Sequence, residues 1–216
     1  MKKLKVKLTF LEDILGTASA DPHVHEKFIA SKAPDAPSRE EEVAAIGVDA
    51  AVEKAMTVFP KLEDGAPYLY DYQIKGFFKD TCGMLSRIAT KDPVTKKKTP
   101  CNESSKLTSF KKVIDGLIFV SPRKIPFDLS GPMGNCERPL RAQTAQGERV
   151  ALANSETVPA GSTVEFEIIC LSPEHEAAVR EWLDYGIFRG IGQWRNSGKG
   201  KFTWEEIAAD EADEAA

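Results

Sequence analysis

Every second residue is apolar in the segment KKLKVKLTF (2–10), from Leu4 to Phe10, and a lysine or threonine lies between each pair. A period of two predicts a strand with one buried face. The segment GERVALANSETVPAGSTVEFEIICLS (147–172) predicts two more strands around a Pro-Ala-Gly turn, with the same alternation from Val164 to Cys170.

A helical period runs through QIKGFFKDTCGMLSRI (73–88), where the apolar residues fall on one side of a helix. Lys75, Lys79 and Arg87 fall on the opposite side. This basic side is either a solvated face or a surface that contacts phosphates.

A second helix is predicted over SPEHEAAVREWLDYG (172–186). Ser172 is a candidate N-cap and Gly186 a candidate C-terminal stop. We expect His175 to face solvent.

Shorter patterns lie between these elements. The segment TVFPKLEDGAPYLYDY (57–72) predicts two short strands around a turn at Glu63-Asp64-Gly65. The apolar run VIDGLIFVSP (113–122) predicts a strand, and KFTWEEI (201–207) predicts a strand or the start of a helix.

The order of elements predicts an α+β domain, with helices on one face of a mostly antiparallel sheet. We expect one domain over residues 1–204. It holds a helical insertion at about 30–56, where Ser38 begins a capping box, and an irregular excursion at about 121–143. An acidic tail follows at 205–216.

The net charge of −4 at pH 7 is unevenly distributed, because no lysine or arginine follows Trp204. An acidic tail of this kind is a frayed helix end, or it masks a basic surface of the same protein. Without the tail the chain is nearly neutral, so any surface that binds a polyanion has to be local.

The chain has no run of about 20 apolar residues and no signal-peptide core, so it predicts neither a membrane span nor a secreted protein. The four cysteines are far apart and form no Cys-x-x-Cys pair. This spacing argues against a zinc site and favours a reducing, cytoplasmic setting. We expect no bound metal or cofactor.

The segment GIGQWRNSGKGKF (190–202) combines glycines, one tryptophan and basic residues without an acid. Glycine lets the backbone approach a ligand, successive N–H groups bind oxyanions, and the indole can stack on a base. The segment lacks the Walker pattern and follows a helix rather than a first strand, so it favours single-stranded nucleic acid over a nucleotide. The alternative is a tight turn with Trp194 in the core. The candidate binding residues here are Arg189, Gly190, Gly192, Gln193, Trp194, Arg195, Asn196, Lys199 and Lys201.

The segment DPHVH (21–25) contains the candidates for catalysis, Asp21, His23 and His25. The two histidines can bind a metal from a strand, or one can act as a general base on a ribose 2′-hydroxyl. Surface or capping roles are the simpler alternative for all three residues.

Four segments resemble the RAMP superfamily, the RNA-binding proteins of CRISPR systems. The segment 190–202 is similar to the glycine-rich loop near the C-terminus of these proteins, and GAPYLYDYQIKGFFKD (65–80) is similar to their strand, turn and Leu-Lys-Gly helix. Ile74-Lys75-Gly76 matches the Leu-Lys-Gly part, whereas Asp71-Tyr72-Gln73 departs from the small-residue turn.

The other two segments are SETVPAGSTVEFEI (155–168), which resembles the late strand pair, and LTFLEDILGTAS (8–19), which resembles the first strand and loop of backbone-type subunits. The insertion at 30–56 and the excursion at 121–143 have no counterpart in this resemblance.

The resemblance implies a ferredoxin-like, RRM-like core that holds single-stranded guide RNA, with Lys75, Lys79 and Arg87 on phosphates. Its implied partners are RNA and other CRISPR effector subunits or further copies of the chain, and Lys96, Lys97 and Lys98 can form a mobile arm against either. Some members of the family cleave RNA with an early histidine or with an aspartate after the first strand, and Asp21 lies in that loop. Two alternatives therefore stay open: an endoribonuclease, and a stand-alone protein, such as one from a mobile element, that mimics a subunit and inhibits a CRISPR complex.

Overall fold

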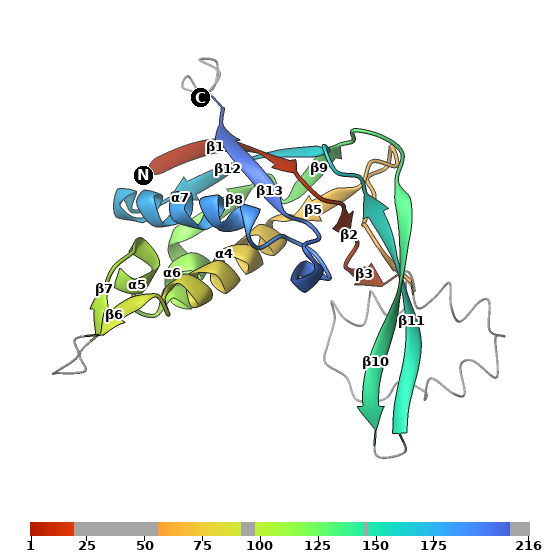
Figure 1. Cartoon of the computed structure of the whole chain (residues 1–216). Helices are drawn as coiled ribbons and strands as arrows, with labels where there is room; N and C mark the ends of the chain where they lie inside the picture. The colour runs from red at the N-terminus through yellow and green to blue at the C-terminus, as the bar shows by residue number, and fades with distance from the viewer. Residues whose placement is uncertain (20–55, 92–97, 145–146, 208–216) are drawn as a thin grey trace, which may run out of the picture.

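The computed structural model describes residues 1–19, 56–91, 98–144 and 147–207. In these ranges a six-stranded sheet has helices packed on one of its faces (Figure 1). The strands follow the order β13-β1-β12-β9-β5, and β8 pairs with β12 beside β9. Their bounds are β1 (Lys2–Phe10), β5 (Tyr68–Tyr70), β8 (Ile118–Ser121), β9 (Lys124–Asp128), β12 (Thr163–Cys170) and β13 (Phe202–Glu206).

Two helices complete a βαββαβ order along the chain. Helix α4 (Asp71–Leu85) lies between β1 and β8, and helix α7 (Glu176–Asp184) lies between β12 and β13. All strand pairs in this sheet are antiparallel. The predicted α+β, ferredoxin-like core is confirmed.

The alternating patterns form the inner face of the sheet. Leu4, Val6, Leu8 and Phe10 of β1 are buried, and Leu8 lies opposite Val164 of β12. The lysines that alternate with these apolar residues along β1 lie on the opposite face of the strand. Each buried aliphatic or aromatic side chain contributes about 1.5–3 kcal/mol relative to an exposed one, so this face is a main source of stability.

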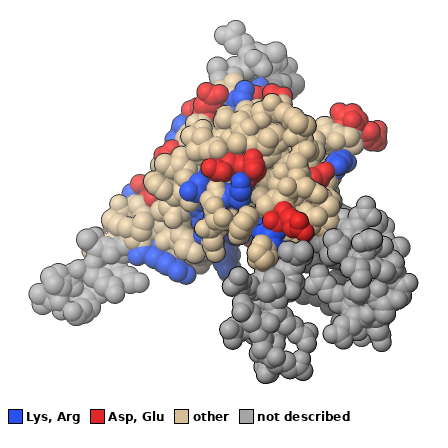
Figure 2. All heavy atoms as spheres, turned by 45° about the vertical axis from the view of Figure 1, so that its right-hand side comes forward, with Lys and Arg blue, Asp and Glu red and all other residues tan. Residues whose placement is uncertain are grey.

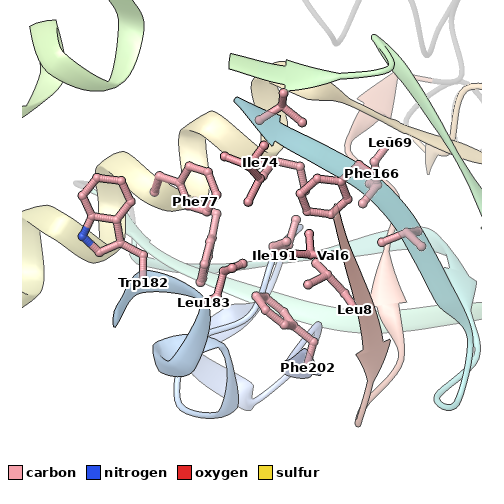
Figure 3. Packing of buried hydrophobic residues seen from close by; sticks show 14 of the residues in the cluster. Val6, Leu8, Leu69, Ile74, Phe77, Phe166, Trp182, Leu183, Ile191 and Phe202 are labelled. Carbon is pink, nitrogen blue, oxygen red and sulfur yellow. The ribbon is translucent and has the colours of Figure 1, made fainter. Parts of the chain in front are cut away.

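The predicted helix α4 packs on that face through its apolar side. Ile74 and Phe77 point toward Val6 and Phe166 of the sheet (Figure 3). From α7, Trp182 packs against Phe78 with ring centroids 5.4 Å apart. Trp182 also donates a hydrogen bond from Nε1 to Ser104 Oγ at 2.9 Å, which satisfies the only polar group of this buried ring.

A second sheet stands beside the first. Its long hairpin, β10 (Gly134–Thr144) and β11 (Gly147–Val158), extends away from the body (Figure 1). Short strands complete this sheet at the root of the hairpin: β2 (Ile14–Leu15), β3 (Ala18–Ser19) and β4 (Thr57–Val58).

The prediction that residues 121–143 are irregular is wrong for most of that segment, because it contains β9 and much of β10. Its prolines do not prevent strand pairing. Pro126 lies opposite Tyr68, and Pro139 lies in β10, at the edge of the second sheet, where no N–H is needed on the outer side.

The strand predicted over 113–122 is also half wrong. Residues Phe110–Leu117 form helix α6, and only Ile118–Ser121 form β8. Ile114 of α6 is fully buried, and Phe110 packs against the same core four residues earlier. This helical spacing begins before residue 113, so the apolar run alone did not show it.

Three expectations around α7 need correction. His175 is buried rather than solvent-facing, because it lies on the same side of the helix as Ala178, Val179 and Trp182. Ser172 makes no side-chain cap bond, since a 3₁₀ turn (Pro173–His175) precedes the helix.

Gly186 does not end the helix in a left-handed conformation. A 3₁₀ turn (Tyr185–Ile187) continues from α7, and a Cβ on Gly186 would overlap the ring of Phe202. At the C-terminus the strand form of 201–207 is confirmed, so Glu205 and Glu206 belong to β13 and not to a helix end.

The remaining described elements lie at the far end of α4. They are β6 (Ala89–Lys91), β7 (Lys98–Pro100) and α5 (Glu103–Lys106). None of the helices in the described ranges is long and apolar enough to cross a membrane. The predicted insertion at 30–56 falls almost wholly outside the described residues.

Candidate nucleic-acid interface

The glycine-rich loop between α7 and β13 closes on itself. Ile191 donates from its backbone N–H to Gly200 O at 3.0 Å, and a Cβ on Gly190 or Gly200 would overlap the opposite side of the loop. Gly192 has φ +88°, and a Cβ there would lie 2.9 Å from Leu15 O. These three glycines are thus required by contacts within the protein.

Both ends of the loop are anchored in the core. The side chains of Ile191 and Phe202 point inward beside Leu8 and Leu183 (Figure 3). The loop backbone is also bonded to the segment after β1, through Gly200 N to Asp13 O at 2.9 Å. The loop is therefore held on a rigid base, and its tip projects from it.

Two predicted arginines connect the loop to helix α4. Arg189 donates from Nε and Nη2 to the carboxylate of Asp80, and Arg195 Nη1 lies 2.8 Å from Asp80 Oδ2. Asp80 is on α4, so the structure brings the loop and the predicted basic helix together. The same carboxylate, however, offsets part of the positive charge of the two arginines.

Lys199 has acidic neighbours as well. Its Nζ lies 3.1 Å from Asp13 Oδ2 and 3.7 Å from Glu12 Oε2. Burial lowers the pKa of Lys199, but the hydrogen bond and charge of Asp13, together with Glu12, outweigh this and raise it. The loop sequence contains no acidic residue, but acidic side chains from other segments lie beside the loop in the structure.

Trp194 is at the tip of the loop. It has a left-handed backbone with φ +55° and is 41% exposed, so it is not part of the core. A 3₁₀ turn (Arg195–Ser197) follows it, with Asn196 exposed to solvent. The alternative that the indole packs in the core is wrong.

Arg138 of β10 lies behind this tip and was missed in the sequence. Its Nη2 donates to Gln193 Oε1 at 2.7 Å, and its guanidinium carbon lies 5.3 Å from the centroid of the Trp194 ring. Arg138 is only 7% exposed, and its Nε and Nη1 have no hydrogen-bond partner within the described residues. Nothing in the local sequence NCERPLRAQ (135–143) marks this arginine, because 55 residues separate it from Gln193.

The predicted basic residues of α4 face away from the loop. Lys75 Nζ donates to Asp115 O at 3.1 Å, and Lys79 Nζ lies 2.5 Å from Asp115 Oδ1. Both lysines therefore lie toward α6, while Asp80 lies toward the loop. Arg87 is exposed just beyond the end of α4.

The charge pattern of the surface follows from these pairs. On the face drawn in Figure 2, basic and acidic atoms lie side by side over the body of the molecule. On this face the basic atoms of the described residues do not form one continuous positive patch.

The candidates Asp21, His23 and His25 fall outside the described residues. Within those residues no cluster of three or more His, Cys, Asp or Glu side chains is arranged to hold a metal ion.

No protein-family model and no curated protein matches the chain. Among solved structures it is similar to a chain in the cryo-electron-microscopy structure of the Type III-B Cmr-beta complex bound to cognate target RNA. That similarity has a TM-score of 0.47 and 11% identity, and it covers 97% of this chain. This chain spans 60% of the length of that one.

Proposed function

We propose that this protein binds single-stranded RNA at the glycine-rich loop and helix α4, as a RAMP-like subunit of a CRISPR ribonucleoprotein. The observation that carries the proposal is the cluster of Arg138, Gln193 and Trp194. It places a buried guanidinium, whose Nε and Nη1 have no hydrogen-bond partner among the described residues, behind an exposed aromatic ring.

A buried charged donor without a partner destabilises a protein, so a ligand that bonds to Arg138 would remove this cost. A phosphate oxygen is a strong partner for a guanidinium. The exposed Trp194 offers a ring for stacking a base, and Gln193 adds an amide. Together these groups match one nucleotide of a single strand.

The four segments that resemble the RAMP superfamily meet at one end of the molecule, which supports the proposal. Ala160 N donates to Asp13 Oδ1 at 3.1 Å, and Gly161 N donates to Phe10 O at 2.7 Å, so the late turn contacts the loop after β1. Gln73 Nε2 donates to Thr17 Oγ1 at 2.8 Å, which joins the start of α4 to the same region. The glycine-rich loop contacts it through Asp13, as described above.

The proposal is tested with Arg138→Met and a fluorescein-labelled RNA of about 20 nucleotides. We expect RNA affinity to fall about tenfold or more, the effect of losing a charge-assisted hydrogen bond. The melting temperature should rise or stay unchanged, since the variant also removes buried unbonded donors. Fluorescence anisotropy between about 50 and 200 mM salt and thermal denaturation measure the two effects.

Arg180→Met is the matched control. Arg180 is bonded to Glu176 and Glu206 on α7 and β13, so this variant should lose stability and keep its RNA affinity. Unchanged RNA affinity in Arg138→Met, or no salt-dependent binding by the wild type, would refute the proposal.

The same labelled RNA distinguishes the two alternative functions, an endoribonuclease and a mimic that inhibits a CRISPR complex. Shortening of the RNA by the wild type, abolished in Asp21→Ala or His25→Ala, would indicate an endoribonuclease. Binding to a purified CRISPR complex without any RNA binding would indicate a mimic that inhibits it.

A further inference from the structure

A cluster of aromatic and basic residues lies on the other side of α4 from the glycine-rich loop. We call it the tyrosine band. Its members are Tyr68, Tyr70, Tyr72, Phe119, Lys75, Arg123 and Lys124. The pairing of β5 with β9 places Tyr70 opposite Lys124, and Asp71 N donates to Arg123 O at 3.0 Å. These contacts hold the start of α4 against the start of β9.

The three tyrosine rings are ordered against one another. Tyr70 and Tyr72 are stacked, with centroids 5.0 Å apart and planes inclined by 18°. Tyr68 meets Tyr70 edge-on at 5.0 Å, and their hydroxyl oxygens are 2.9 Å apart. Tyr72 is the outermost ring and is 55% exposed. The ring of Tyr72 is therefore held in place by Tyr70 and is still accessible to solvent.

The cations of the band lie over rings. Lys124 Nζ is 5.5 Å from the centroid of Tyr68, the Arg123 guanidinium carbon is 5.9 Å from that of Tyr70, and Lys75 Nζ is 4.9 Å from that of Phe119. None of these three cations forms an ion pair with a described residue. A cation over a ring keeps its full charge and most of its N–H groups for a ligand.

We infer that the tyrosine band is a second nucleobase-stacking site, where Tyr72 stacks on a base and Lys75, Arg123 and Lys124 contact phosphates. The inference rests on the proposed function and extends the RNA-binding surface across α4. Between the band and the loop lies Gly76 of α4, and no described atom outside the helix backbone lies within 4 Å of the position that a Cβ would take there. A strand can therefore approach the helix closely on its way from one side to the other.

The chemistry of the band favours a nucleic acid over a protein partner. Asp115, the acidic residue whose backbone oxygen accepts from Lys75, has its carboxylate paired with Lys79. The exposed rings of Tyr72 and Phe119, beside cations that have no ion pair with a described residue, match the bases and phosphates of a single strand. A protein partner would have to supply several carboxylates instead.

Photo-crosslinking tests the inference directly. RNA of about 20 nucleotides carrying 5-iodouridine is irradiated with the full-length protein, and the attached peptides are identified by mass spectrometry. We expect crosslinks at Tyr72 in addition to Trp194, and the Tyr72 crosslink should persist in Trp194→Ala. Crosslinks at Trp194 alone would overturn the inference and leave the proposed function intact, whereas the absence of any RNA binding would overturn both.

Affinity measurements give the second test. Tyr72→Ala should weaken RNA binding about five- to 150-fold, the range for one stacked base. Tyr72→Phe should retain binding, and Tyr72→Glu should weaken it further by repelling phosphates. Phe188→Ala is the control, because Phe188 is also an exposed aromatic residue but packs against Tyr185 without a cation. Unchanged affinity in both Tyr72→Ala and Tyr72→Glu would contradict the inference.

Discussion

The two sides of helix α4 carry their positive charge in different ways. On the loop side, Arg189 and Arg195 share the carboxylate of Asp80, and Lys199 is bonded to Asp13. In the tyrosine band, the cations lie over aromatic rings instead. A carboxylate offsets the charge of its partner, whereas a ring does not. A count of basic residues along the chain therefore overstates the positive potential of the loop and understates that of the band.

The ion pairs of the loop cations with Asp80 and Asp13 fix the position of the loop. Asp80 ties two loop residues to a helix, and the glycines let the loop close on itself. The loop side is thus a shaped surface that contains Arg138, whose Nε and Nη1 lack a partner among the described residues, and the band is a charged surface on which Tyr72 and Phe119 are exposed. The predictions below separate shape from charge.

The largest effect is expected for Gly200→Ala. Gly200 has φ +69°, and a Cβ there would overlap Ile191 O. We expect the free energy of unfolding to fall by about 3 kcal/mol, which lowers Tm by about 6–12 °C. Gly65→Ala is the control, because Gly65 has φ +86° with no described atom within 4 Å of its Cβ position. Equal losses in the two variants, measured by thermal denaturation, would show that the close contact across the loop is unimportant.

Asp80→Asn should have the next largest effect and opposite consequences for stability and binding. Unfolding free energy should fall by about 1–2 kcal/mol, because the two arginines lose a partly buried partner. RNA affinity should rise, with a steeper salt dependence, because both arginines become free for phosphates. The control Asp115→Asn removes a carboxylate that is 57% exposed and should change Tm little. Weaker RNA binding in Asp80→Asn would mean that loop shape outweighs charge.

Alkaline pH should weaken the tyrosine band selectively. Burial, with the hydrogen bond to Tyr70 and the charges of Tyr70 and Tyr72, raises the pKa of Tyr68 to about 12 despite the opposing charge of Arg123. The folded state thus favours the neutral phenol. This stabilisation is complete below about pH 10, the unfolded pKa, and is lost as pH rises toward 12. Tyr68→Phe should show a shallower fall of Tm over this interval, and an identical fall would contradict the assignment.

The smallest effect is expected for Gly76→Ala. The change favours the helix and should raise the free energy of unfolding by about 0.5–1 kcal/mol, or Tm by about 1–4 °C. If one RNA strand crosses α4 between its two sides, the added methyl group should reduce affinity slightly. Anisotropy titration checks this, and unchanged affinity would indicate that the two sides bind RNA separately.

The sequence predicted the elements whose pattern is self-contained. Strand β1, helix α4 and strand β12 each show a clear period, and all are present. Strand β11 is also present, but it lies in the second sheet and pairs with β10 rather than with β12. Helix α6 was missed because its helical spacing begins at Phe110, before the apolar run, and the run itself continues into β8. His175 was predicted to face solvent, although its spacing to the buried Ala178 and Val179 is helical. His175 belongs to the 3₁₀ turn before α7, and the sequence did not show that this turn continues the buried side of the helix.

The candidate site was predictable only in part, for a physical reason. The loop and α4 stood out as basic segments, and the structure joins them at Asp80. Asp13 and Asp80, the carboxylates that pair with the cations of the loop, are far from the loop in the sequence. Arg138 reaches the loop only because of the fold of the second sheet, and Arg123 and Lys124 reach the rings of Tyr70 and Tyr68 only because β9 pairs with β5.

The anchoring of the glycine-rich loop at Ile191 and Phe202 has a consequence for protein engineering. Because Ile191 and Phe202 are buried in the core and the stem closes on itself, the exposed tip at Trp194 and Asn196 is the part of the loop where substitutions should disturb the fold least. We therefore expect the scaffold to keep its architecture when Trp194 or Asn196 is replaced, which makes this tip a suitable position for inserting other short sequences.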